Sequence, residues 1–296
     1  MKVSPFAPKR PALAWYGGGW TRAPWTIGFF PEAARVNFID PTFGPGSVTL
    51  RKPAARLESI NDKDRRVTNF FTQLRDNRDK LLELIKWSPY SQAELERCIP
   101  VAGDPLEDAR RFFILCWLTL QGGPTARPGD FRYQKNVDNR YAPPPWDIMS
   151  REDLYVTADR LRGVQIFNED AIVFIRRFLQ QESCVVYLDL PYLQSTRARK
   201  KGYNHEPSPA YHRLAAQVLR QHKGYVIVAG YKSRLYERMY EAYGYQRVER
   251  VQKDRAGNLR VECLWLCPRT QQALAEEKLQ REKRPLSLTL FDGVTS

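Results

Sequence analysis

The chain has 296 residues, and its 47 Lys and Arg against 33 Asp and Glu give a net charge of +14. Its 43% hydrophobic and 12% aromatic residues are enough for a sizeable core, which excludes a disordered chain. With 17 Gly and 21 Pro, a fibrous chain is also excluded. No apolar run approaches the roughly 18 residues of a membrane span, and no secretory signal pattern begins the chain. We therefore expect a soluble intracellular protein.

The positive charge and the cysteines bound the function further. An excess of Lys and Arg of this size favours a polyanionic partner, although a basic protein without such a partner is the alternative. The five cysteines are odd in number and form no C-x-x-C pair, and there are only three histidines. We expect the cysteines to be small buried hydrophobic residues, and we expect no metal site and no disulfide.

The beginning of the chain alternates strands and helices. Residues 36–40 form a short apolar run that ends in a carboxylate and predicts a strand, followed by a loop at 41–46. Ser47 predicts the cap of a helix over 47–50. A second strand is expected at 56–61, before an amphipathic helix with apolar residues between 67 and 74. This alternation favours a parallel sheet in an α/β fold.

The middle of the chain has a different pattern. Residues 78–121 have helical periodicity, and 122–146 form a long loop rich in Gly, Pro and basic residues, of the kind that is usually functional. The α/β pattern then returns with expected strands at 164–167, 184–188 and 225–229, helices at 170–180 and 209–222, a closing hairpin of 246–251 and 259–267, and a charged helical tail from 269. We predict an α/β sheet domain of residues 1–75 and 161–268, a helical insertion at 76–160 and a tail at 269–296.

The first candidate site is the loop Asp40-Pro41-Thr42-Phe43-Gly44-Pro45-Gly46. Glycines after a first strand allow backbone N–H groups to approach a ligand, and ligands of open α/β sheets bind at the carboxyl ends of strands. Asp62 follows Asp40 by 22 residues, close to the roughly 20 that separate loop and ribose-binding acid in nucleoside-binding units. The G-x-G-x-x-G dinucleotide pattern is absent. A tight turn without a ligand is the alternative.

Two further segments carry candidate chemistry. In Asp189-Leu190-Pro191-Tyr192, a carboxylate and a main-chain carbonyl at a strand end can accept both hydrogens of a ring amino group, while the tyrosine stacks on the ring. A strand that ends at Asp and turns at Pro is, however, common without function. The segment Trp15-Tyr16-Gly17-Gly18-Gly19-Trp20 surrounds three glycines with aromatic rings, which suits a flat ligand or, alternatively, packing on the sheet.

Taken in chain order, these segments resemble the Dam-type DNA adenine methyltransferases, including phage and bacterial members. The resemblance covers roughly residues 11–268 and includes Asn61-Asp62, Gly230-Tyr231 and Glu262-Cys263-Leu264-Trp265. It implies a Rossmann-like methyltransferase sheet with a helical target-recognition insertion. It also implies transfer of a methyl group from S-adenosylmethionine to the N6 amino group of adenine in double-stranded DNA, by a monomer without a metal, in the cytoplasm of a bacterial or phage-infected cell.

The resemblance assigns roles to these positions. The residues implied to bind the donor are Trp15, Tyr16, Gly17, Gly18, Asp40, Pro41, Phe43, Gly44, Gly46, Ser47 and Asp62, with Asp62 on the ribose. Asp189, Leu190, Pro191 and Tyr192 are implied to hold a flipped adenine. Extrusion of a base from the duplex costs a few kcal/mol of free energy, which stacking of the base and contacts with the phosphates would offset.

The chain departs from the family pattern at three motifs. Gly19 stands where the family has the lysine of Gly-Gly-Lys, so Lys9, Arg10 or Arg22 would have to supply a cation. Asp40-Pro41-Thr42 replaces Glu-Pro-Phe, Pro45 replaces a loop glycine, and Leu190 replaces a proline whose carbonyl it matches. These changes leave two alternatives open: a DNA-binding homologue that has lost donor binding, and a methyltransferase that acts on cytosine amino groups or RNA.

Basic residues in two loops are the candidates for contact with nucleic acid. Phosphate contacts need Lys and Arg, and these loops would flank the base pocket. A solvated charged surface is the alternative. The candidates are Arg127, Arg132, Tyr133, Lys135, Arg140, Arg197, Arg199, Lys200 and Lys201.

Overall fold

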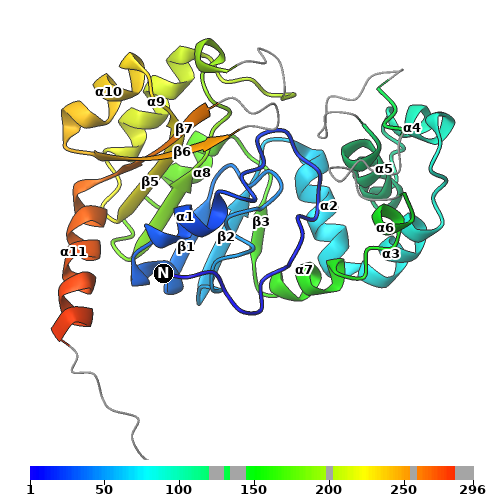
Figure 1. Ribbon diagram of the computed structural model, residues 1–296, viewed down its shortest axis with the longest axis horizontal. Coiled ribbons are helices and arrows are strands. Elements are labelled where there is room, and N and C mark those ends of the chain that lie inside the picture. Colours follow the sequence, from blue (N-terminus) through cyan, green and yellow to red (C-terminus); the bar gives the residue numbers. More distant parts are fainter. Residues whose placement is uncertain (120–129, 134–144, 198–202, 254–258, 284–296) are drawn as a thin grey trace, which may run out of the picture.

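The computed structural model describes residues 1–119, 130–133, 145–197, 203–253 and 259–283 (Figure 1). Within these residues, seven strands form one sheet in the order β3-β2-β1-β4-β5-β7-β6. The strands are β1 (Asn37–Asp40), β2 (Leu57–Asn61), β3 (Gln165–Phe167), β4 (Cys184–Leu188), β5 (Tyr225–Tyr231), β6 (Gln246–Lys253) and β7 (Leu259–Leu266).

The sheet confirms the predicted α/β class and the closing hairpin. Strands β1 to β5 are parallel to one another, whereas β7 pairs antiparallel with both β5 and β6. The central strands β1 and β4 are buried along their whole length, as expected for parallel strands that helices cover on both faces. The order β2-β1-β4 places the carboxyl ends of these three strands side by side at one edge of the sheet.

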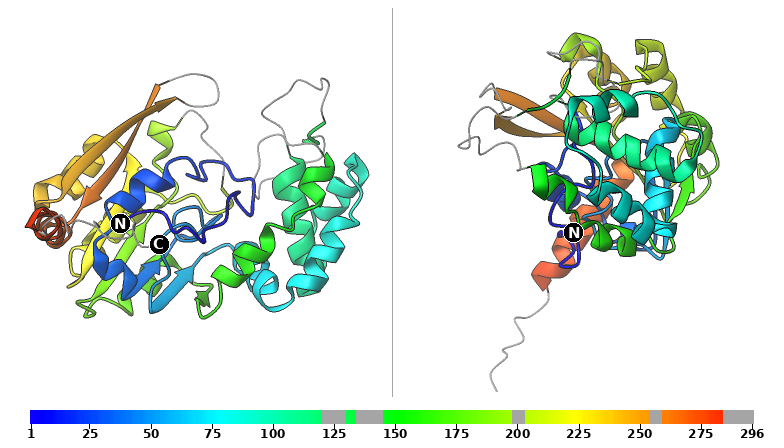
Figure 2. Two further views of the ribbon diagram at one scale, coloured as in Figure 1. Left: turned by 60° about the horizontal axis from the view of Figure 1, so that its bottom comes forward. Right: turned by 90° about the vertical axis from the view of Figure 1, so that its right-hand side faces the viewer.

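Helices cover both faces of the sheet (Figures 1 and 2). Apolar residues of α8, α9 and α10 form one buried cluster with β4 and β5, and α1 and the N-terminal segment form another on the opposite face. The helices are α1 (Ala23–Gly28), α2 (Arg65–Asp76), α3 (Arg78–Lys86), α4 (Gln92–Cys98), α5 (Pro105–Leu118), α6 (Pro145–Met149), α7 (Leu154–Arg160), α8 (Ala171–Arg176), α9 (Pro209–Leu219), α10 (Arg234–Met239) and α11 (Pro268–Lys283), with short 3-10 turns η1 (Glu32–Arg35), η2 (Gln194–Thr196) and η3 (Glu241–Tyr243).

Capping residues explain where several helices begin. Asp64 accepts a hydrogen bond from the Arg66 N–H at the start of α2, and Asp104 accepts one from the Glu107 N–H at the start of α5. Ser208 caps α9 in the same way. These side chains satisfy backbone donors that the first helical turn leaves unpaired.

The predicted helix at 47–50 is wrong, because these residues form consecutive turns. Pro53 follows closely. Because proline disfavours helical backbone at the residue before it, a helix that starts at 47 would have to end within a few residues. Ser47 is buried and its hydroxyl makes no hydrogen bond, so it is not a cap. The helix expected at 170–180 is shorter, since α8 ends at Arg176. Most of the loop expected at 122–146 lies outside the described residues.

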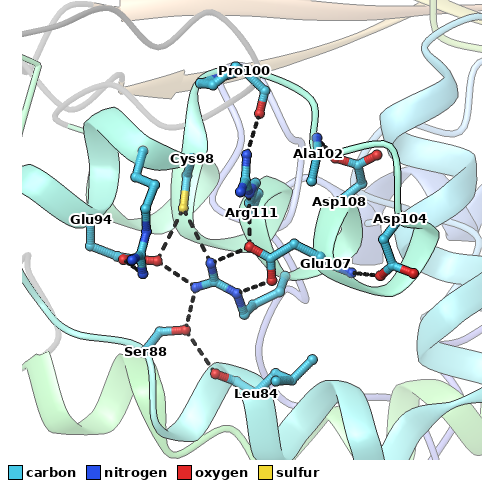
Figure 3. A network of polar contacts seen from close by, with 12 residues as sticks. Leu84, Ser88, Glu94, Cys98, Pro100, Ala102, Asp104, Glu107, Asp108 and Arg111 are labelled. Atoms are coloured by element: carbon cyan, nitrogen blue, oxygen red, sulfur yellow. Dashed lines mark hydrogen bonds and ion pairs between the residues drawn. The ribbon is translucent and has the colours of Figure 1, made fainter.

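The helices α3, α4 and α5 gather at one end of the molecule, away from the β6–β7 hairpin (Figures 1 and 2). They share a continuous apolar core with α2 and α7. Within it, the buried Arg110 of α5 donates to Ser88, Glu94 and Glu107, which ties α4 to α5 (Figure 3). The boundaries of an inserted recognition region at 76–160 stay a prediction.

All five cysteines are buried with free thiols. Among the described residues, no helix is both long enough and apolar enough to cross a membrane. In the same part of the chain, no group of three or more His, Cys, Asp and Glu is arranged to hold a metal ion.

Candidate active site

Three aspartates stand at the carboxyl ends of neighbouring strands. Asp40 ends β1, Asp62 follows β2, and Asp189 follows β4. All three line a single cavity of about 1380 Å³, where an open parallel sheet is expected to bind its ligand.

The cavity brings together most of the predicted site residues. Every residue assigned to base binding lines it, as does every residue assigned to the donor except Gly46. Gly46 shapes the loop instead: its φ is +69°, and a Cβ there would lie 2.4 Å from Cζ of Phe43. Phe43 itself packs edge-on against Phe71 of α2, which fixes the loop to the helical core.

Asp40 is buried with both carboxylate oxygens engaged. Oδ1 accepts a hydrogen bond from the Thr42 N–H at 3.2 Å, and Oδ2 accepts one from the Thr49 hydroxyl at 2.5 Å. Burial raises the pKa of Asp40 to about 7, against the effect of these two hydrogen bonds. A bound cation would stabilise its charged form.

Asp62 ties the glycine loop to the end of β2. Its Oδ2 accepts the Gly44 N–H and its Oδ1 accepts the Asp64 N–H, each at 2.8 Å. Burial raises the pKa of Asp62 to about 6. Each oxygen keeps a further lone pair, so the carboxylate can also accept ligand hydroxyls.

Aromatic residues enclose the cavity near the glycines of the N-terminal segment. The Tyr203 hydroxyl donates to the Tyr16 carbonyl at 3.1 Å, and the two rings meet edge to face. A Cβ on Gly17 would lie 2.8 Å from the Tyr203 oxygen, so the absent side chain permits this approach. Gly18 packs in the same way against Trp15 and Pro45, which gives the substituted Pro45 a packing role.

The segment after β4 is held from several sides. The Asp189 N–H donates to Oγ1 of Thr42 at 3.0 Å, so the unusual threonine links the β1 and β4 loops. The Tyr187 hydroxyl donates to Oδ2 of Asp189 at 3.1 Å. The Tyr192 ring packs edge-on against Tyr231, with ring centroids 4.5 Å apart.

Arg22 is one of the three cations expected to replace the missing lysine, whereas Glu262 is a site residue to which the sequence gave no role. Arg22 Nη2 donates to Oδ2 of Asp189, and Nη1 donates to Oε2 of Glu262, both at 2.7 Å. Arg22 also contacts the hydroxyl of Tyr192. The missing lysine at position 19 was the signal that some cation had to serve here. Only the fold reveals that the hairpin strand β7 contributes a second acid.

The predicted nucleic-acid contacts are only partly described. Arg132 and Arg197 line the cavity, and Tyr133 is exposed. The side chain of Arg197 is 4% exposed and pairs with Glu206, so it is buried inside the site rather than displayed on the surface. The remaining candidates lie outside the described residues; they are Arg127, Lys135, Arg140, Arg199, Lys200 and Lys201.

An open, mostly parallel sheet with acids at three adjacent strand ends defines an α/β protein whose ligand site is expected at those ends. The family model of D12 class N6 adenine-specific DNA methyltransferases matches residues 104–253, which is half of the chain. The chain belongs to this family, as the sequence motifs predicted. No curated protein matches it. Its family therefore connects it with adenine methylation in DNA, and methyltransferases of this family use S-adenosylmethionine.

Proposed function

We propose that this protein transfers a methyl group from S-adenosylmethionine to N6 of a flipped adenine in double-stranded DNA. The observation that carries the proposal is that Asp62 and Asp189 line the same cavity. A donor bound beside one and a base bound beside the other would meet inside that cavity. Had the two acids stood on opposite sides of the molecule, no such transfer could occur.

The residues around the donor half of the cavity fit S-adenosylmethionine. Asp40 and Asp62 supply negative charge for a ligand that carries a sulfonium and an ammonium group. Asp62 can accept ribose hydroxyls, and Gly44 leaves the backbone open beside the Trp15 ring, where a flat nucleoside could lie. When bound, the donor supplies an electrophilic methyl group.

The residues after β4 would prepare the acceptor. The amino nitrogen of adenine is a weak nucleophile because its lone pair is delocalised into the ring. The Asp189 carboxylate and the Leu190 carbonyl would each accept one N–H, which draws the nitrogen toward tetrahedral geometry and aims its lone pair. The Asp189 carboxylate can take the proton that the nitrogen releases after transfer. Catalysis then depends mainly on positioning.

The base would be held by stacking. The Tyr192 ring is fixed at its hydroxyl by Arg22 and Glu262, and at its edge by Tyr231. A rigid ring offers stacking energy at low entropic cost, which offsets part of the cost of base flipping. The net charge of +14 favours binding to the phosphate backbone.

The test is incubation of labelled donor with unmethylated DNA, followed by nucleoside analysis and by calorimetric titration of the donor. We expect labelled N6-methyladenine, and we expect Asp189→Asn to lose transfer while it keeps donor binding and duplex binding. An Asp189→Asn protein with full activity would refute the assignment. Absence of donor binding in the wild type would instead favour the DNA-binding homologue, and label on cytosine or in RNA would favour the other alternative.

A further inference from the structure

A buried ionic cluster joins the base-binding segment to the C-terminal hairpin. Arg22, at the N-terminal end of α1, is 3% exposed and bridges Asp189 after β4 and Glu262 on β7. The Tyr192 hydroxyl donates to Oε2 of Glu262 at 2.9 Å. The Gln252 amide on β6 donates to the other oxygen, Oε1, also at 2.9 Å. Glu262 is therefore held by β6, by Arg22 and by the segment after β4.

The bonds to Asp189 fix the orientation of its carboxylate. Arg22 and the Tyr187 hydroxyl both bind Oδ2. Neither of these two bonds uses Oδ1, so Oδ1 is the oxygen that we assign to a further donor such as an amino N–H. Arg22 also lies over the Tyr192 ring, 5.8 Å from its centroid, so one guanidinium contacts both the acid and the ring next to it.

Position 19 and Arg22 compete for the same space. Gly19 has φ +64°, and a Cβ there would lie 2.8 Å from Nη2 of Arg22. A long side chain at position 19, such as the lysine of the family pattern, would displace the guanidinium. The glycine thus makes room for a cation that comes from three residues further along the chain.

We propose that Arg22, anchored by Glu262, is a positioning residue for methyl transfer that orients the Asp189 carboxylate and holds it in its charged form. The inference rests on the proposed function, since Asp189 must accept an N–H from the base. The contacts of Arg22 are with Asp189, Tyr192 and Glu262, so its effect on methyl transfer would pass mainly through Asp189.

The electrostatics give Arg22 and Glu262 opposite effects. Burial raises the pKa of Asp189, Arg22 lowers it, and Glu262 raises it. Removal of the guanidinium charge should therefore favour the protonated acid, which cannot accept through Oδ1 in the same way. The charged and titratable groups that face Asp189 are Arg22, Glu262, Tyr187, Tyr192, Asp40, Tyr203 and Tyr236.

The experiment compares the full-length variants Arg22→Gln, Arg22→Lys and Glu262→Gln in single-turnover methyl transfer across pH. For Arg22→Gln we expect the acidic side of the pH–rate profile to move to higher pH, and at a pH on that side the rate should fall about tenfold for each pKa unit of the shift. Arg22→Lys should stay close to the wild type. Glu262→Gln should leave this side of the profile in place or move it to lower pH.

Arg110→Gln is the matched control. Arg110 is a comparably buried, doubly paired arginine, but it lies in the α4–α5 cluster outside the cavity. Arg110→Gln should lower the free energy of unfolding without shifting the acidic side of the pH–rate profile. If Arg22→Gln keeps the wild-type profile, or if all three neutral variants move it alike, the role is merely structural and the inference is overturned.

A second measurement needs neither donor nor DNA. Infrared difference spectra across pH detect a protonated carboxyl through its C=O band, and the part due to Asp189 is the part that Asp189→Asn removes. We expect this band to persist to higher pH in Arg22→Gln than in the wild type, and an unchanged titration would contradict the inference. A wild type that transfers no methyl group would overturn the proposed function, yet these spectra would still test the effect of Arg22.

Discussion

Oδ2 of Asp62 accepts the backbone N–H of Gly44 at 2.8 Å, so the acid after β2 also fixes the loop after β1. Its other oxygen accepts the Asp64 N–H, which starts the turn into α2. One carboxylate therefore sets the shape of the loop and presents lone pairs to the cavity. A change at this residue should affect both functions.

We predict that Asp62→Asn weakens donor binding by at least about tenfold. The amide offers one acceptor for two backbone N–H groups, so one buried donor is left unpaired, at a cost of about 1–3 kcal/mol. Calorimetric titration measures the affinity, and urea unfolding measures the stability. Asp76→Asn is the control, because Asp76 is a half-exposed partner of Arg75 and should leave donor affinity unchanged. Equal affinity in Asp62→Asn and the wild type would remove Asp62 from the donor site.

Donor affinity should increase with pH. The pKa of Asp40 is about 7 and that of Asp62 about 6 in the free protein, both raised by burial, and a cationic ligand binds best to the charged acids. We expect the dissociation constant to rise about tenfold per pH unit as pH falls from 7 to 6, and more steeply below 6. Isothermal titration in buffers of different ionisation heat should detect proton release on binding near pH 6. A pH-independent affinity over this range would contradict the prediction.

The stability of the protein without donor should decrease with pH, opposite to the donor affinity. The pKa of Asp40 is higher in the folded chain than in the unfolded chain. Its stabilising contribution to the free energy of unfolding is therefore fully present below about pH 4 and is lost as pH rises through 7. The donor-induced increase in melting temperature should therefore be larger at pH 8 than at pH 6. Asp40→Asn should still fold, and it should lose most of the difference between the donor-induced increases at pH 8 and pH 6.

The sequence predicted the acids of the site because their positions follow from local pattern. Asp40 and Asp189 end apolar runs that could only be buried strands, and parallel strands bring such ends together. Arg22 could not be assigned in the same way, since its contacts with Asp189 and Glu262 span 167 and 240 residues. Thr42 read as a departure from a motif, whereas its hydroxyl accepts the Asp189 N–H, which only the sheet order makes possible.

The helix predicted at 47–50 failed for a similar reason. A capping serine after a loop indicates a helix only when the following residues can continue the helix. Here Pro53 prevents a helix from continuing. The segment instead supplies tertiary contacts. Thr49 binds Asp40 through its hydroxyl, and its carbonyl accepts a hydrogen bond from Arg160 of α7. The role of Thr49 therefore depends on contacts with residues distant in the fold, which the local sequence pattern does not predict.

A second buried group of charges centres on Glu58 of β2. Glu58 on β2 pairs with Lys52 at 2.5 Å and with Arg160 at 2.6 Å, and all three are nearly inaccessible to solvent. We predict that Glu58→Gln lowers the free energy of unfolding by about 3–5 kcal/mol, because two buried cations lose their counter-charge. Lys52→Met should cost less, since Arg160 continues to neutralise Glu58. Urea unfolding measures both, and the reverse order would contradict this account.

The two glycines of the donor loop should differ in their tolerance of a side chain. Gly44 has φ +52°, and the nearest atom to a Cβ is 3.7 Å away, so Gly44→Ala should cost only the left-handed backbone, about 1–2 kcal/mol. Gly46 has φ +69°, and a Cβ would overlap Phe43 at 2.4 Å and Leu50 at 2.8 Å. Gly46→Ala should therefore cost about 1–3 kcal/mol more, and it should displace the Phe43 ring and weaken donor binding. Urea midpoints and donor titration of the two variants test this, and equal losses would show that the loop adjusts freely around Gly46.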